Sequence, residues 1–174
     1  MNIFSAGGKV VPMQRIEQFI NETLTGEAQR NALDFTTYLT ESELLFERCL
    51  NGFWEDKLYW IVKYKDKTVC QIFINGYEKG DWVVWSDDSG SNPFNEFPLG
   101  EHTKDIAWKN VGFCGGGGCC RDMGTRKVIF GKEFDNVCFT TLRFDNPNTE
   151  AVDCMKKMVE IRKTDILSNV QQAK

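Results

Sequence analysis

The chain of 174 residues is 41% hydrophobic and 13% aromatic, with a formal net charge of −4. This length and composition predict one folded domain with an apolar core and exclude an intrinsically disordered chain. Lysine and arginine are scattered along an acidic chain, so we expect no nucleic-acid partner. No stretch approaches the roughly 20 apolar residues of a membrane helix, so we expect no membrane partner.

The first residues and the cysteines bear on domain organisation and location. We interpret residues 1–12 as a flexible leader and residues 13–174 as a single domain. The leader has no basic segment followed by an apolar run, so it does not resemble a secretory signal. The seven cysteines are an odd number without the spacing of a disulfide framework. They indicate free thiols and a cytoplasmic location.

Two helical patterns begin the domain. From Met13 to Leu24 the apolar residues recur at helical spacing, and Gly26 is placed to stop that helix. A second pattern runs from Glu27 to Leu39. Thr40 and Glu43 then match a capping box ahead of the segment LLFERCL. That segment is compatible with a short helix or with an extended strand.

The hydrophobic period then changes to two, which is typical of strands. Residues 56–66, 68–75 and 81–88 predict three antiparallel strands joined as a meander, with a tight turn at Asp66–Lys67. One face of the first strand would carry Leu58, Trp60, Val62 and Tyr64. The other face would carry Tyr59, Ile61, Lys63 and Lys65.

The last part of the chain predicts further elements of both kinds. Residues 101–110 suit a short helix, and residues 126–131 and 136–144 suit two strands. A long helix follows, for which Asn146 suits the N-cap and Pro147 the first helical position. The expected fold is α+β, with an antiparallel meander sheet of about five strands packed against the N-terminal helices and a long C-terminal helix.

The segment GFCGGGGCCRDMGTRK places three cysteines around four consecutive glycines. A structural zinc site needs four Cys or His ligands. Cys138, or His102 as the only histidine, would have to complete the set. We therefore expect, as one hypothesis, a zinc or iron site formed by Cys114, Cys119, Cys120, Cys138 and His102. The segment lacks the paired Cys-x-x-Cys spacing that makes a zinc motif specific.

Two other interpretations of this loop remain open. The positive charges of Lys109, Arg121 and Arg126 would lower the pKa of a nearby thiol, which suits a catalytic or redox cysteine. Alternatively, the loop has no chemistry and its cysteines pack as small apolar residues. A phosphate-binding P-loop is excluded because the pattern GxxxxGK[ST] is absent. No catalytic residue is assigned.

Aromatic residues gather on the predicted meander. Trp60, Tyr64 and Trp82 would share a sheet face and line a ligand pocket against the helices. The alternative is that they fill the core of a small α+β fold.

The strand pair LYWIVKYKDKTVCQIFI and the closing segment FDNPNTEAVDCMKKMVEIRK follow an order of elements that resembles small bacterial domains of the frataxin-like, YdhG type. The resemblance covers about a quarter of the chain by pattern. It implies an α+β fold, and frataxin-like proteins are associated with iron handling through acidic surfaces. No functional residue transfers from it.

Together these observations predict a non-enzymatic cytoplasmic α+β protein that binds an unknown small ligand or a metal through the cysteine–glycine loop. One alternative is a thiol-dependent enzyme or redox sensor that uses Cys114, Cys119 or Cys120. Another is a protein-interaction module that uses the aromatic sheet face.

Overall fold

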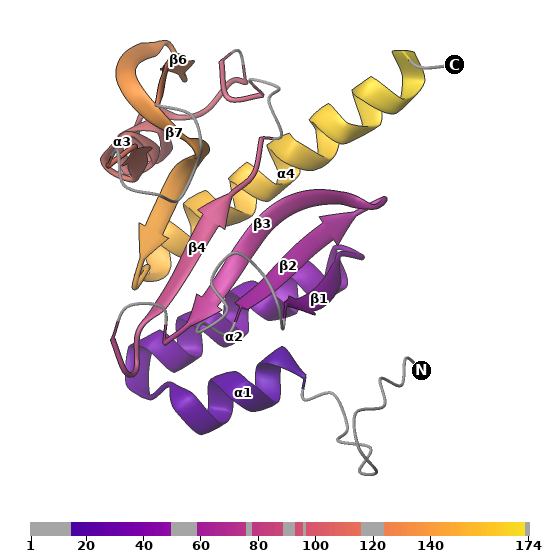
Figure 1. The fold of residues 1–174 in the computed structure, drawn as a ribbon, viewed down its shortest axis with the longest axis vertical. Coiled ribbons are helices and arrows are strands. Elements are labelled where there is room, and N and C mark those ends of the chain that lie inside the picture. The colour runs from indigo at the N-terminus through magenta and orange to yellow at the C-terminus, as the bar shows by residue number, and fades with distance from the viewer. Residues whose placement is uncertain are drawn as a thin grey trace.

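The structure is a computed structural model that describes residues 15–49, 59–75, 78–88, 93–95, 97–115 and 124–172. These residues form four helices and seven strands (Figure 1). The helices are α1 (Ile16–Thr23), α2 (Gly26–Glu41), α3 (Glu101–Lys109) and α4 (Thr149–Gln172). The strands are β1 (Leu45–Cys49), β2 (Tyr59–Tyr64), β3 (Lys67–Ile74), β4 (Trp82–Ser86), β5 (Val111–Phe113), β6 (Thr125–Ile129) and β7 (Lys132–Asp145). The predicted leader lies outside the described residues.

The strands form one antiparallel sheet in the order β1-β2-β3-β4-β7-β5, with β6 paired to β7. The predicted meander is therefore confirmed as β2, β3 and β4. Its first turn lies one residue earlier than expected, because Lys65 and Asp66 have φ values of 46° and 63°. Two successive residues with positive φ are the signature of a two-residue hairpin turn whose twist matches that of the strands.

The helices cover one face of the sheet. Figure 1 shows α2 and α4 behind the strands and α3 beside β7. The Phe19 ring of α1 lies 5.5 Å from that of Trp60, and the Phe35 ring of α2 lies 6.4 Å from that of Trp82. One buried apolar cluster includes residues from all four described helices. The fold class is therefore α+β, as predicted.

The two faces of β2 differ as its alternating sequence predicts. Trp60 and Val62 are buried in the main core, and Tyr64 packs against it. Tyr59 instead joins Phe73 and Val83 in a smaller cluster on the other face. The alternation of side chains thus separates two apolar layers.

The predicted capping box at Thr40 is wrong. Thr40 lies inside α2, and its hydroxyl donates to Thr36 O at 2.9 Å. The helix ends when Glu43 adopts a φ of 63°, and Leu44 N then donates to Leu39 O at 3.1 Å. This reversal sends the following segment into the sheet as β1, so the extended alternative for LLFERCL is confirmed.

Candidate functional site

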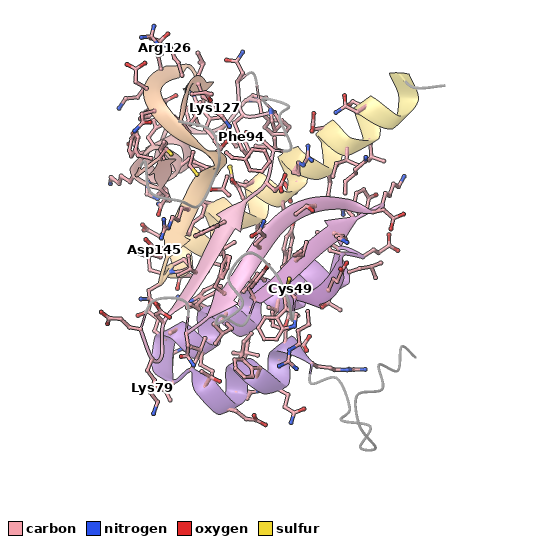
Figure 2. All side chains as sticks on the ribbon, in the orientation of Figure 1. Cys49, Lys79, Phe94, Arg126, Lys127 and Asp145 are labelled. Atoms are coloured by element: carbon pink, nitrogen blue, oxygen red, sulfur yellow. The ribbon has the colours of Figure 1, made fainter. Side chains whose placement is uncertain are left out.

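A pocket of about 360 Å³ lies where three segments distant in sequence meet. It is formed by the start of α2, the β3–β4 connection and the β7–α4 connection. Its described lining residues are Glu27, Ala28, Asn31, Glu78, Lys79, Gly80, Asp81, Asn146, Pro147 and Asn148. Figure 2 labels Lys79 at this end of the molecule, far from Lys127. The volume is within the range of small-molecule sites.

The wall from α2 is held by Asn31, which is buried. Its Nδ2 donates to Pro147 O at 3.0 Å, and its Oδ1 accepts a longer hydrogen bond of 3.4 Å from Thr149 Oγ1. Gly26 begins the helix with a φ of +61°, a conformation that costs glycine little. The chain can therefore reverse after α1 and bring the first turn of α2 to the start of α4.

The wall from the β3–β4 connection is built by Asn75 and Asp81. Asn75 N donates to Asp81 O at 2.9 Å, and Asn75 Oδ1 accepts from Gly80 N at 2.7 Å. Asp81 Oδ2 accepts from Glu78 N at 3.0 Å. Asn75 and Gly80 both have positive φ, which asparagine and glycine tolerate better than other residues. The short polar side chains thus hold the backbone of this wall in place.

The third wall contradicts the predicted helix start. Asn146 is not the N-cap of α4, because it has a φ of 46° and pairs with β4. Its N–H donates to Trp82 O, and its Oδ1 accepts from Trp82 N, both at 2.9 Å. Asn148 is the cap instead, since its Oδ1 accepts from Ala151 N at 3.0 Å. Sequence analysis named only Asn146 as the cap, because the long-range pairing of Asn146 with Trp82 cannot be recognised from the local pattern.

The charges around the pocket are unbalanced. Among the described lining residues, Glu27, Glu78 and Asp81 carry three negative charges against the one positive charge of Lys79, which leaves two negative charges in excess. Asp81 is only 8% exposed. The starts of α2 and α4 each add a partial positive charge of about one half. The acidic residues Glu27 and Glu150 in the first turns oppose that contribution.

The chemistry of the lining suits polar ligands. Its described members supply carboxylates, amides and one ammonium group, all of which form hydrogen bonds or ion pairs with polar ligands.

The structure describes three of the five predicted metal ligands. Cys119 and Cys120 lie outside the described residues. Cys114 follows β5, and its N–H donates to Asn136 O at 2.9 Å. Cys138 lies two residues further along β7, so the thiols of Cys114 and Cys138 are on neighbouring strands.

His102 has a different environment on α3. Its Nε2 lies 3.9 Å from a carboxylate oxygen of Glu150 on α4, and both side chains are exposed. Within the described ranges, no three His, Cys, Asp or Glu side chains are grouped so as to hold a metal ion. His102 therefore does not join Cys114 and Cys138 in such a group.

Two other cysteines are buried and chemically protected. Burial raises the pKa of Cys154 to about 12. Burial, and then the negative charge of Asp87, also raises the pKa of the Cys70 thiol. A thiol with a raised pKa forms little of the reactive thiolate near neutral pH. Any thiol chemistry in the described part of the chain therefore belongs to Cys49, Cys114 or Cys138.

The predicted aromatic residues share one sheet face, as expected, and lie against the helices. Trp60 and Trp82 are buried in the core. Tyr64 is half-buried, and Lys163 Nζ of α4 lies 4.7 Å from the centre of its ring. Trp60, Tyr64 and Trp82 are not among the lining residues of the pocket described above.

A second set of buried polar side chains lies where β4 ends, near Phe94 and Lys127 in Figure 2. Asp88 is fully buried, and its Oδ2 lies 2.7 Å from Lys127 Nζ and 2.6 Å from Thr141 Oγ1. A neighbouring cavity lined by Ser86 and other residues has a volume of only about 10 Å³. That space holds at most one water molecule, so we interpret this set as structural.

Exposed large apolar side chains are few in the described ranges. Leu45, Phe113 and Phe139 are 68%, 58% and 55% exposed. Leu45 belongs to β1, whereas Phe113 and Phe139 belong to the paired strands β5 and β7. Single exposed apolar residues are normal on protein surfaces. The interaction-module hypothesis stays a prediction.

Sequence analysis did not identify the pocket, although local signals were present. Asn75 precedes a glycine, and Asn146 and Asn148 flank Pro147, which are patterns typical of turns. Those patterns indicate reversals of the chain, but they do not indicate which reversals meet.

Comparisons with family models, with curated proteins and with solved structures found no match for this chain. The resemblance to frataxin-like domains therefore stays a prediction. Within the described residues, no helix is both long enough and apolar enough to span a membrane.

Proposed function

We propose that this protein binds a small polar molecule in the pocket between α2, the β3–β4 connection and the β7–α4 connection. The observation that carries the proposal is that a side chain fixes each wall by a hydrogen bond to backbone. Asn31 bonds to Pro147 O, Asn75 to Gly80 N and Asn146 to Trp82 N. A site whose walls are already ordered loses less entropy when a ligand binds.

The proposal can be tested with nuclear magnetic resonance of the nitrogen-15-labelled chain and a panel of polar small molecules. The panel contains amines, carboxylates, sugars and polyols. We expect at least one compound to shift the amide signals of residues 27–31, 78–81 and 146–148 in a saturable way. A panel that shifts none of these signals would contradict the proposal.

A matched pair of variants checks that binding occurs in the pocket. Ala28→Trp introduces a large side chain into the lining without removing any of the wall hydrogen bonds. Arg30→Trp places the same side chain at an exposed position of α2 that is not among the lining residues. We expect the first variant to lose binding and the second to retain it. Loss in both variants would locate binding elsewhere.

A second proposal keeps the cysteine–glycine loop as a zinc or iron site. It is supported by the hydrogen bond of Cys114 N to Asn136 O, because Asn136 lies two residues before Cys138 on β7. The five described cysteines are free, which also favours a cytoplasmic location. Elemental analysis after anaerobic purification should find about one zinc or iron per chain, and Cys114→Ser should remove it. Metal-free protein contradicts this second proposal.

A further inference from the structure

We infer that the ligand of this pocket carries a positively charged amine. This inference rests on the proposed function and names the chemical class of the ligand. The excess of two negative charges around the pocket provides the first argument. A cavity lined mainly by one sign of charge concentrates ligands of the opposite sign.

The position of Asp81 strengthens this argument. Its carboxylate is largely buried in the pocket wall, and its Oδ2 is held by the N–H of Glu78 at 3.0 Å. Glu78 lies three positions earlier on the same connection and is exposed. An ammonium group donates three hydrogen bonds and bonds to carboxylates more strongly than a neutral donor does. Two carboxylates on one wall therefore suit an amine.

The starts of the two helices do not provide a competing site for an anion. Asn148 Oδ1 already occupies the N–H of Ala151 in the first turn of α4. At α2, the carboxylate of Glu27 belongs to the first turn and lines the pocket. A bound anion would therefore be repelled by Glu27 at the start of α2, and at the start of α4 it would find the N–H of Ala151 already hydrogen-bonded to Asn148.

A divalent metal ion is a poorer candidate than an amine. Calcium and magnesium require several oxygen ligands directed at one point. The carboxylates of the described residues are not grouped in that way. An amine on a flexible chain needs no such convergence, because each hydrogen bond can go to a different wall.

Three probes that differ only in their end groups test the inference. Putrescine, 1,4-butanediol and adipate each have a chain of four methylene groups, ending in ammonium, hydroxyl and carboxylate groups respectively. Each is titrated into the labelled full chain at constant ionic strength. We expect putrescine to shift the signals of residues 27–31 and 78–81 at concentrations at which the other two leave them unchanged.

Charge-changing variants then assign the contacts. We expect Asp81→Asn and Glu78→Gln each to weaken putrescine binding about tenfold, the loss of one charge-assisted hydrogen bond. Lys79→Gln should strengthen binding, because it removes the single positive charge of the lining. Asp153→Asn changes charge on the exposed surface of α4 and should have no effect. If Asp81→Asn weakened putrescine binding only by disturbing the fold, there would be no reason for Lys79→Gln to strengthen it.

The outcomes separate this inference from the proposed function. Equal shifts by all three probes, or pocket binders that are all neutral or anionic, overturn the amine inference and leave the pocket as a binding site. If neither the three probes nor any compound of the wider panel shifts the pocket signals, both ideas are overturned. If the three probes leave the pocket signals unchanged but the wider panel contains a larger amine that shifts them, the inference stands.

Discussion

The Nζ atom of Lys127 on β6 lies 2.7 Å from Oδ2 of Asp88, a carboxylate without exposed surface. Lys127 Nζ also donates to Thr141 Oγ1 at 2.6 Å, and this hydroxyl donates to the same oxygen of Asp88. Thr141 has a φ of 53°, an unusual value for a β-branched residue. The hydrogen bonds therefore compensate for local backbone strain and connect β6 and β7 to the end of β4.

Removing the carboxylate from this pair should destabilise the fold strongly. In Asp88→Ala the ammonium of Lys127 loses its buried partner, which typically costs about 3 kcal/mol of the free energy of unfolding. Urea denaturation followed by tryptophan fluorescence measures the change. The exposed pair of Arg126 and Asp135 on the same hairpin is the control. Asp135→Ala should cost less than about 1 kcal/mol, and equal losses in the two variants would contradict the structural role of Asp88.

The pairing of Asn146 with Trp82 predicts an order of stability. Asn146→Gly keeps a residue that tolerates positive φ but removes the acceptor for Trp82 N, which should cost about 1 kcal/mol. Asn146→Ala loses the acceptor and also strains the backbone, which should cost a further 1 kcal/mol or so. Thermal unfolding should therefore rank the wild type first, the glycine variant second and the alanine variant last. A more stable alanine variant would be inconsistent with the φ of 46°.

Four of the five described cysteines should react in two groups. Cys114 and Cys138 are half-buried, whereas Cys70 and Cys154 are buried with raised pKa values. We expect iodoacetamide at pH 8 to label Cys114 and Cys138 in the native protein, and Cys70 and Cys154 only after unfolding. Peptide mass spectrometry after timed labelling distinguishes the sites. A single native thiol that reacts much faster than glutathione would instead favour the thiol-enzyme hypothesis.

The buried thiols should also make the fold less stable in alkali. The pKa of Cys154 rises from an ordinary value of 9.0 to about 12 in the folded protein. Below about pH 9 the thiol is neutral in both states and its burial has no pH dependence. Above it, only the unfolded chain ionises, so the free energy of unfolding falls as the pH rises towards 12, by up to about 1.4 kcal/mol per pH unit.

The variant Cys154→Ala isolates this contribution. It should show a shallower fall in the free energy of unfolding between pH 8 and pH 10 than the wild type, because the thiol that ionises on unfolding is gone. Burial also raises the pKa of Tyr38, which both proteins share, so the difference between their slopes reports Cys154. Urea midpoints at several pH values measure it, and identical slopes would contradict the burial of this thiol.

The sequence predicted the elements whose pattern is local. The alternation in β2 assigned Trp60 and Tyr59 to opposite faces because successive strand residues point to opposite sides. The capping box at Thr40 was wrong because its pattern also fits the interior of a helix. The strand β1 stayed ambiguous for a similar reason, since five residues are too few to show a period.

For the candidate site, too, the sequence predicts the local features and the tertiary structure decides the long-range contacts. By itself the sequence predicts a break in the chain at Asn75 and a helix cap at Asn146, because asparagine tolerates positive φ and bonds to nearby backbone. Only the tertiary structure decided that these turns meet the start of α2. Asn31 reaches Pro147 across 116 positions of the chain. No local propensity specifies such a contact, because it depends on how the helices pack on the sheet.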